Sequence, residues 1–182
     1  MAVLIEEEEY IPRYTYDDYK RWEGKWELIK GIPYAMSPAP VIRHQEISAN
    51  IGTELKEKAK SCEKCKSLQA VDWKIDEKTV VCPDNLLVCG DNIGEQYLVK
   101  TPQIIFEVLS PSTMFKDRNV KFKLYEKMGV QYYILVDTSA KVAEVFRLEN
   151  GAYEKLKNAQ DEIVTFTPEN CTIEFDFGKI WE

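Results

Sequence analysis

The sequence lacks any apolar run long enough to cross a membrane. A membrane-spanning helix needs about 20 consecutive apolar residues, and no segment of the 182-residue chain approaches that length. The chain also lacks the basic-then-apolar layout of a secretory signal, because it begins with the apolar residues 1–5, followed by four glutamates. We therefore expect a cytoplasmic protein with no membrane partner.

Basic residues are outnumbered by acidic ones. The chain has 24 Lys and Arg against 31 Asp and Glu, a net charge of -7. Since Lys and Arg make the phosphate contacts, this balance disfavours a protein that coats nucleic acid through charge alone. One segment differs from this average, because it combines two acids with five cations: Lys116, Arg118, Lys121, Lys123 and Lys127. This pattern indicates either a local basic patch or an ordinary solvated helix face.

Cysteine is scarce, and its number is odd. Five cysteines in a chain without a secretory signal indicate reduced thiols. Cys62 and Cys65 have the spacing of a zinc half-site, but Cys82 and Cys89 lack the matching short spacing. The sequence therefore gives little support for zinc. Cys82 and Cys89 alternate with apolar residues, so we expect them to pack as small apolar side chains in a strand.

The apolar pattern predicts one domain over residues 1–182, with residues 1–12 poorly ordered, and no repeat or low-complexity segment is present. Helices are predicted at 15–22, 41–60 and 115–128. Strands are predicted as a hairpin at 26–36 and then at 67–75, 79–89, 102–109, 132–136, 142–148, 153–156, 163–166 and 171–173. After the N-terminal helix and hairpin, the order is α-β-β-β-α-β with C-terminal antiparallel strands. This order predicts an α/β (α+β) fold with a central mixed sheet flanked by helices, in which strands 102–109 and 132–136 are parallel.

Two carboxylates lie inside strands that should be buried. Glu107 lies in the apolar run 103–109, and Asp84, next to Pro83, interrupts a second apolar run. Because a buried ionised carboxylate is unfavourable unless it is paired, hydrogen-bonded or bound to metal, the two acids predict a bound cation. The alternatives are a turn role for Asp84 and an ion pair between Glu107 and Lys121. A proline within a strand marks a bulge or edge that can turn a side chain toward a site, which favours function.

His44 is the only histidine in the chain. It lies three residues before Ile47 and seven before Ile51, on the inward-facing side of the helix predicted at 41–60. Its pKa range and its position near a helix start suit contact with phosphate or proton transfer. The alternative is a hydrogen-bonded core histidine.

Several short motifs together resemble the Uma2-type proteins, a branch of the PD-(D/E)xK restriction-endonuclease-like nucleases. They are Trp-Glu-Leu-Ile-Lys-Gly at 26–31, Met-Ser-Pro at 36–38 with His44, Cys-Pro-Asp at 82–84, Glu-Val-Leu-Ser-Pro-Ser-Thr at 107–113, Asp117 with Lys121 and Tyr125, and Gly-Val-Gln-Tyr-Tyr at 129–133. The resemblance covers nearly the whole chain. It implies a restriction-endonuclease-like core of α-β-β-β-α-β order, the same order that the periodicity predicts.

The resemblance also implies a metal site. Asp84 and Glu107 would hold Mg²⁺, or Mn²⁺ in its place, and the backbone carbonyl of Val108 is the expected third protein ligand. Mg²⁺ prefers oxygen ligands and keeps several waters, so such a set leaves positions for phosphate and water. Glu27 would extend this shell or accept a proton, and its alternative is an acid satisfied by hydrogen bonds within the hairpin.

The family's usual lysine stands two residues after the second acid, where this chain has Leu109. The helical position of Lys121 faces the sheet, whereas Lys123 points roughly the opposite way. We therefore take Lys121 as the displaced lysine. In this role it would stabilise charge on the reacting phosphate or hold the attacking water.

The resemblance implies a Mg²⁺-dependent endonuclease that hydrolyses DNA. The alternative is an inactive protein that keeps the nuclease fold and serves as a nucleic-acid-binding or protein-interaction module, since a fold alone does not establish activity. A homodimer is a further expectation, because many enzymes that cut both strands of a duplex are two-fold symmetric.

Overall fold

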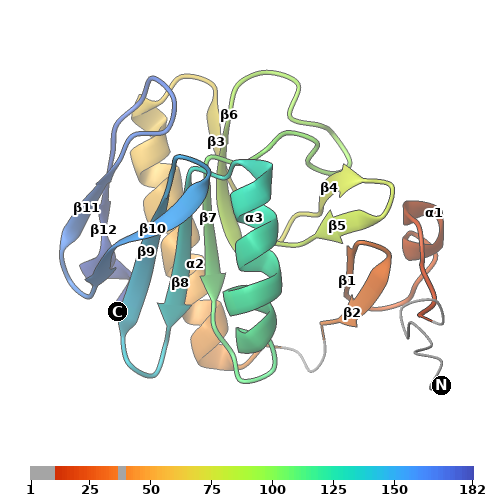
Figure 1. The fold of residues 1–182 in the computed structure, drawn as a ribbon. Helices are drawn as coiled ribbons and strands as arrows, with labels where there is room; N and C mark the ends of the chain where they lie inside the picture. The colour runs from red at the N-terminus through yellow and green to blue at the C-terminus, as the bar shows by residue number, and fades with distance from the viewer. Residues whose placement is uncertain (1–10, 37–39) are drawn as a thin grey trace, which may run out of the picture.

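The computed structural model describes residues 11–36 and 40–182, so the expectations for residues 1–10 and for the Ser37–Pro38 motif lie outside the described residues. A six-stranded sheet with the order β10-β9-β8-β7-β6-β3 forms the centre of the molecule (Figure 1). Its strands are β3 (Cys65–Gln69), β6 (Asn85–Cys89), β7 (Ile104–Val108), β8 (Tyr132–Asp137), β9 (Val142–Glu149) and β10 (Ala152–Ala159). The β7–β8 pair is parallel and the other pairs are antiparallel, which confirms the predicted mixed sheet.

Helices cover both faces of this sheet. The long helix α2 (Ile42–Lys58) packs on one face through the buried residues Ile47, Ile51 and Leu55, and a short 3-10 turn, η2 (Ala59–Ser61), continues it. The second helical segment packs on the opposite face and consists of a π-helical turn, η3 (Lys116–Lys121), followed by α3 (Phe122–Met128). It ends at Gly129, whose φ of 79° is the left-handed conformation that glycine adopts readily at a helix C-terminus.

Strand β7 supplies side chains to both faces because successive residues of a strand point in opposite directions. Ile104, Phe106 and Val108 belong to the apolar cluster beneath α2, whereas Ile105 belongs to the cluster beneath α3. Glu107 therefore points toward α3. The same strand thus contributes an aromatic ring to one layer and a carboxylate to the other.

A smaller four-stranded sheet lies beside the α3 layer (Figure 1). Its order is β2 (Ile32–Ala35), β1 (Trp26–Ile29), β5 (Thr79–Val81) and β4 (Trp73–Asp76). Strands β1 and β2 form the predicted hairpin, and both residues of its turn have positive φ, 53° at Lys30 and 79° at Gly31. Two such residues in a row are the signature of a tight turn that matches the twist of a hairpin. Before it, α1 (Tyr16–Tyr19) is shorter than the helix predicted at 15–22.

The strands predicted at 67–75 and 79–89 are each broken in two, and in this detail the prediction is wrong. The first divides into β3 and β4, and the second into β5 and β6. Both breaks carry the chain between the small and the large sheet. Pro83 has no N–H with which to continue a ladder, and the Ala70 N–H donates to the Asp84 carbonyl at 3.1 Å, which joins the two bends. Asp84 therefore lies at a sheet-to-sheet crossing.

The C-terminal segment is antiparallel, as predicted. After the β9–β10 hairpin, β11 (Ile163–Phe166) pairs with β12 (Ile173–Asp176), and the 3-10 segment η4 (Phe177–Trp181) follows. Phe166, Phe175 and Phe177 extend the apolar cluster beneath α2. Among the described residues, no helix is both long and apolar enough to span a bilayer.

The prediction of reduced cysteines is wrong for four of the five. Cys62 is bonded to Cys171, and Cys65 to Cys89, while Cys82 is free. Cys62 and Cys171 are 109 positions apart, so their pairing depends on the fold and has no local sequence signal. Cys65 and Cys89 are direct partners in the β3–β6 register, which is why their side chains meet.

Candidate active site

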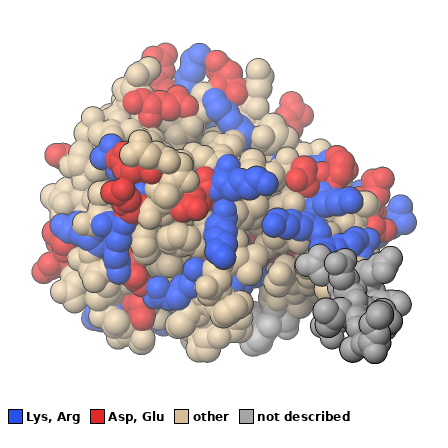
Figure 2. Space-filling model, in the orientation of Figure 1, with Lys and Arg blue, Asp and Glu red and all other residues tan. Residues whose placement is uncertain are grey.

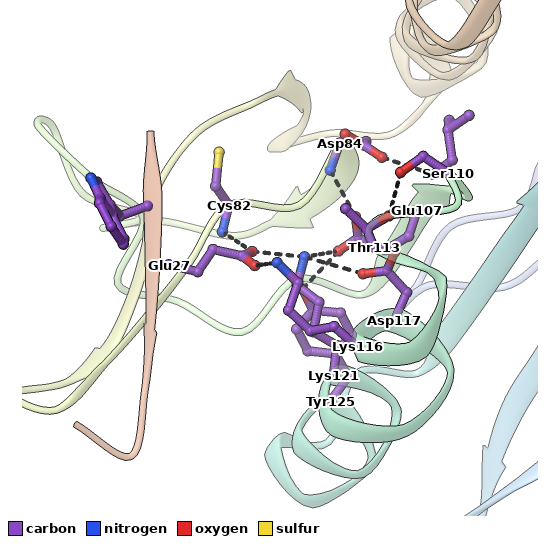
Figure 3. Close-up of polar contacts among 12 residues, drawn as sticks. Glu27, Cys82, Asp84, Glu107, Ser110, Thr113, Lys116, Asp117, Lys121 and Tyr125 are labelled. Carbon is purple, nitrogen blue, oxygen red and sulfur yellow. Dashed lines mark hydrogen bonds and ion pairs between the residues drawn. The ribbon is translucent and has the colours of Figure 1, made fainter. Parts of the chain in front are cut away.

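The site begins at the crossing between the two sheets, where Asp84 and Glu107 meet (Figure 3). The Asp84 carboxylate accepts a hydrogen bond of 2.8 Å from the Val108 N–H, and the Asp84 N–H lies 3.4 Å from the Glu107 Oε2 atom. The Asp84 carboxylate thus contacts the N–H of the residue after Glu107, and the Glu107 carboxylate contacts the N–H of Asp84 itself. These two contacts fix the position of one acid relative to the other. The Asp84 side chain is 22% exposed, whereas that of Glu107 is only 3% exposed. Solvent therefore reaches the pair from the Asp84 side.

Glu107 is held on its other oxygen by two side chains of the helical segment. Its Oε1 atom accepts hydrogen bonds from the Lys121 ammonium at 2.7 Å and from the Tyr125 hydroxyl at 2.9 Å. Lys121 and Tyr125 are four residues apart and lie on the same side of the helical segment. The Oε2 atom of Glu107 faces Asp84, so the two oxygens of this carboxylate have different surroundings.

Lys121 lies between three carboxylates. Its ammonium is 2.7 Å from both Glu27 and Glu107, and 3.8 Å from Asp117. Its side chain is 2% exposed, so the structure places Lys121 against the sheet, as its helical position predicts. Lys123, two residues further on, is exposed.

Glu27 is fully buried, and both of its oxygens have partners in the structure. Oε1 contacts Lys121 and accepts a hydrogen bond of 2.9 Å from the Cys82 N–H, and Oε2 is paired with Lys116. Asp84, Glu107, Asp117 and Lys121, together with Glu27 and Lys116, form a charged cluster. Figure 3 shows Glu27 reaching this cluster from β1, on the side opposite Asp84. Glu27 is thus satisfied by two lysines and a hydrogen bond from outside the hairpin, whereas the alternative for this residue placed its hydrogen-bond partners within the hairpin.

Lys116 is a member of the cluster that the sequence analysis did not identify. In a regular α-helix, residues five positions apart point about 140° apart, since each residue advances the helix by roughly 100°. The segment Lys116–Lys121 is instead a π-helical turn, whose wider repeat places residues five apart near one face. Both lysines consequently reach Glu27. The only sequence signal for this arrangement was the density of cations.

The basic segment is consequently not one surface patch. Lys116 and Lys121 are buried, Arg118 is ion-paired with Glu144, and Lys123 and Lys127 are exposed. On the face of the molecule shown in Figure 2, Lys and Arg are interspersed with Asp and Glu.

His44 joins the site from the first turn of α2. Its Nε2 atom is 3.4 Å from the Asp84 carboxylate. Burial alone would lower the pKa of His44, but the hydrogen bond and charge of Asp84, with a contribution from the Val108 carbonyl, raise it overall. The Nδ1 atom of His44 is buried and has no hydrogen-bond partner among the described residues. The raised pKa of His44 therefore favours its protonated, positively charged form beside Asp84.

Negative charge is in excess in the cluster. Glu27, Asp84, Glu107 and Asp117 are four acids, and Lys116 and Lys121 are two cations, so the formal charge with all six ionised is -2. Burial raises the pKa of Glu107 well above its usual range, and the neighbouring carboxylates add to this, although Lys121 opposes it. Burial likewise raises the pKa of Asp117. For Glu27, burial is outweighed by the two lysines, which lower its pKa.

Asp84 and Glu107 are the residues of this arrangement that could hold a divalent cation. Among the described residues, no group of three or more His, Cys, Asp or Glu is arranged to hold a metal ion. Mg²⁺ does not require such a group, because it is commonly bound through one or two carboxylates and fills its other positions with water and phosphate. Asp84 and the Oε2 side of Glu107 offer two such carboxylates.

Comparison with solved structures identifies the fold. The crystal structure of a "putative nuclease belonging to DUF820" from Anabaena variabilis ATCC 29413 superposes with a TM-score of 0.74. The match covers 92% of this chain and 97% of that one, at 16% sequence identity. The expected fold class is thereby confirmed.

Comparison of sequences identifies the family. Residues 16–174 match the profile of Uma2, described as "Putative restriction endonuclease", and the chain belongs to this family. Two relatives come from Synechocystis sp. (strain PCC 6803). The "Uncharacterized protein sll1609" is 30% identical over 112 residues, which is 59% of this chain and 59% of that protein. The "Uncharacterized protein slr1290" is 30% identical over 147 residues, which is 71% of this chain and 72% of that protein. The chain thus shares its family with putative restriction endonucleases and its fold with a putative nuclease.

Proposed function

We propose that this protein is a metal-dependent endonuclease that hydrolyses phosphodiester bonds of DNA, with Asp84 and Glu107 as the metal ligands. The observation that carries the proposal is the reciprocal contact between these two acids. The Val108 N–H holds the Asp84 carboxylate at 2.8 Å, and the Glu107 Oε2 atom faces the Asp84 N–H at 3.4 Å. Two carboxylates fixed beside each other at a sheet crossing, one of them partly exposed, support this proposal.

Mg²⁺, or Mn²⁺ in its place, is the proposed cofactor, and the Val108 carbonyl is the proposed third protein ligand. When bound, such an ion polarises a phosphoryl oxygen and lowers the pKa of a coordinated water. The protein's contribution is orientation. The Val108 N–H fixes Asp84, while Lys121 and Tyr125 fix the far oxygen of Glu107 and leave the Oε2 atom turned toward Asp84.

Lys121 is proposed to complete the site as the displaced lysine. In the structure its ammonium contacts Glu27, Glu107 and Asp117. It therefore favours the ionised form of Glu107, against the effect of burial on the pKa of that group. Lys116 and Glu27 hold Lys121 in place, because Glu27 bridges the two lysines. His44, which contacts Asp84 at 3.4 Å, is proposed to exchange a proton with a water or phosphate bound beside that acid.

One observation favours the alternative of an inactive, nuclease-fold binding module. The net charge is -7. A nuclease acting on long DNA would gain affinity from an excess of Lys and Arg, which contact phosphates. The alternative predicts that the folded protein neither cuts nucleic acid nor responds to divalent cations.

The test is cleavage of supercoiled plasmid with Mg²⁺ or Mn²⁺, compared with single-stranded DNA and RNA. The parent is compared with Asp84→Asn, Glu107→Gln and Lys121→Met, each checked for folding by circular dichroism. Lys123→Met is the matched control, because Lys123 lies on the same helical segment but is exposed. We expect the control to cut like the parent and the two acid variants to lose cleavage at least about 100-fold, as when a group that stabilises the transition state is removed.

Each result decides between the two functions. Loss of cleavage in both acid variants supports the metal site, and loss in Lys121→Met supports the displaced lysine. Full activity in Lys121→Met would refute the role of that residue alone. A parent protein that is folded, cuts none of the three substrates and binds no divalent ion would refute the endonuclease and leave the binding module.

A further inference from the structure

One aromatic side chain is exposed, and its residue adjoins the charged cluster in the sequence. Phe115 is 76% exposed, whereas every other aromatic residue that the structure describes is buried or half-buried. An exposed phenylalanine lacks the stabilisation that burial of its ring would give. Phe115 directly precedes Lys116, which is paired with Glu27 in the charged cluster. The exposed ring is therefore available to a ligand that reaches the site.

Phe115 has exposed apolar neighbours on the segments that form the site. Eight large apolar side chains are exposed in the described part of the chain, and four of them belong to these segments: Val41, Ile42, Met114 and Phe115. Ile42 is 80% exposed and begins α2. Single exposed apolar residues are ordinary, but a group of them beside a candidate site indicates a surface that a ligand covers. We call these four residues the apolar rim.

Asp84 joins the two segments that carry the apolar rim. His44, in the first turn of α2, lies 3.4 Å from the Asp84 carboxylate. The same carboxylate accepts a hydrogen bond of 2.8 Å from the Val108 N–H at the end of β7. From there the chain turns toward Met114, whose N–H donates to the Ser110 carbonyl at 2.9 Å. The apolar rim therefore belongs to the two segments that meet at the partly exposed acid of the site.

The turn between β7 and Phe115 carries hydroxyl groups. The Ser110 Oγ atom lies 3.1 Å from the Ser112 Oγ atom and 3.0 Å from the Thr113 Oγ1 atom, and Ser112 is exposed. Serine and threonine hydroxyls are common donors to phosphate oxygens in nucleic-acid complexes. The segment that leads from β7 to Phe115 thus combines uncharged groups suited to a phosphate with a ring suited to a base.

We propose that the apolar rim contacts unpaired bases beside the scissile phosphate, with one base stacked on Phe115, so that the substrate is DNA whose bases are unpaired at the cut. Charge favours this substrate over an intact duplex. A chain of net charge -7 gains little from phosphates, and a duplex hides the faces of its bases. An unpaired base presents its face to an aromatic ring, and this contact needs no positive charge. The proposal rests on the proposed function, because it takes the substrate at Asp84 and Glu107 to be DNA.

The test is binding of fluorescein-labelled DNA of equal length, followed by fluorescence anisotropy. The probes are an oligothymidylate single strand, the same strand paired with oligoadenylate, and a single strand of abasic residues. The full-length protein carries Asp84→Asn, so that no cleavage competes with binding, and the parent in EDTA repeats each measurement. We expect the oligothymidylate strand to bind more tightly than both other probes.

Phe115→Ala should weaken binding of the oligothymidylate strand at least about 5-fold, the low end of what stacking of one base contributes. It should leave binding of the abasic strand unchanged, because the base that would stack is missing. The dependence of affinity on salt should also stay the same, since a stacking contact releases no counterions. Phe115→Trp should keep the affinity of the parent. Leu156→Ala is the matched control, because Leu156 is an exposed apolar residue on the edge strand β10.

The proposal is wrong if folded Phe115→Ala protein binds the oligothymidylate strand like the parent, or loses the same affinity for the abasic strand. It is also wrong if Phe115→Ala leaves binding unchanged but turns a dimer into a monomer in analytical ultracentrifugation, since the apolar rim is then an interface between copies. Cleavage tests the proposed function separately. A protein that cuts intact duplex equally well with and without Phe115 keeps the nuclease and refutes only this proposal. A protein that binds single strands through Phe115 but cuts no DNA supports the apolar rim and refutes the nuclease.

Discussion

Both faces of the central sheet carry an apolar cluster, but they differ in the charges they bury, and two successive residues of strand β7 show this. Phe106 enters the layer beneath α2, where its ring packs 5.0 Å from that of Phe175. Glu107 enters the layer beneath α3, where it contacts Lys121 and Tyr125. The first face gains stability from the removal of apolar surface from water. The second holds buried charges whose removal from water is unfavourable and whose mutual attraction offsets this only in part.

This contrast predicts that the stability of the fold and the chemistry of the site depend on different faces of the sheet. Replacing apolar side chains beneath α2 should weaken the fold without changing the site. Replacing charges beneath α3 should change the site, and its effect on stability should depend on which partner is left unpaired.

The largest loss of stability is expected from Phe175→Ala. Phe175 is fully buried, and its ring lies 5.0 Å from Phe106 and 4.8 Å from Phe177. Truncating a buried phenylalanine costs about 3–5 kcal/mol, from lost transfer free energy and the cavity left behind. Urea denaturation measures this, with Ile163→Ala as control, because Ile163 lies in the same hairpin but is 60% exposed. Cleavage is measured at a temperature low enough for the Phe175→Ala protein to stay folded. Loss of cleavage under that condition would show that the apolar face beneath α2 also affects the site.

Lys121→Met should cause the second largest loss of stability, with the free energy of unfolding reduced by about 3 kcal/mol in metal-free buffer. The change leaves Glu27 and Glu107 without the cation that lies 2.7 Å from each, and removing one partner of a buried pair costs about 3–5 kcal/mol. The lower end is expected because Glu107 can take up a proton. Lys123→Met is the control and should change stability by no more than about 0.5 kcal/mol.

The pH dependence of this loss tests its electrostatic origin. The pKa of Glu107 is raised in the folded protein by burial, and Lys121 opposes that rise. A group with a raised folded-state pKa favours folding below its unfolded pKa, near 4.5, and this stability is lost as the pH rises through the folded-state pKa. Without Lys121 the folded pKa rises further. The difference between Lys121→Met and the parent should therefore grow from pH 5 toward pH 8, whereas a packing defect would be independent of pH.

The sequence predicted much of this contrast but not all of it. The apolar run around Glu107 and the helical position of Lys121 are local patterns, so they could be read from the sequence. The breaks near Ala70 and Pro83 were missed because strand propensity does not indicate that a chain changes sheets. Lys116 was missed because the prediction assumed a regular helix, and the Cys62–Cys171 bond because it joins residues 109 positions apart.

Lys116→Met should have a smaller effect than Lys121→Met. Lys116 is paired with one oxygen of Glu27, while the other oxygen keeps Lys121 and the Cys82 N–H. Glu27 therefore stays partly compensated, and we expect a loss of about 1–3 kcal/mol, the range for a buried acceptor left unsatisfied. Lys127→Met, at an exposed position of the same helical segment, is the control. A loss equal to that of Lys121→Met would show that the two lysines act as one unit.

The smallest effect is expected from the metal itself, and it connects the charged face to the proposed chemistry. A ligand at ten times its dissociation constant stabilises the folded state by roughly 1.4 kcal/mol, so Mg²⁺ or Mn²⁺ should raise the melting temperature of the parent. Glu107→Gln should lose this shift, because the amide keeps a hydrogen-bond acceptor for Lys121 and Tyr125 but removes the charge. Glu174→Gln, an exposed acid of β12, should keep it. If Glu107→Gln also responds fully to Mg²⁺, the ion binds elsewhere, and the excess negative charge beneath α3 serves the fold alone.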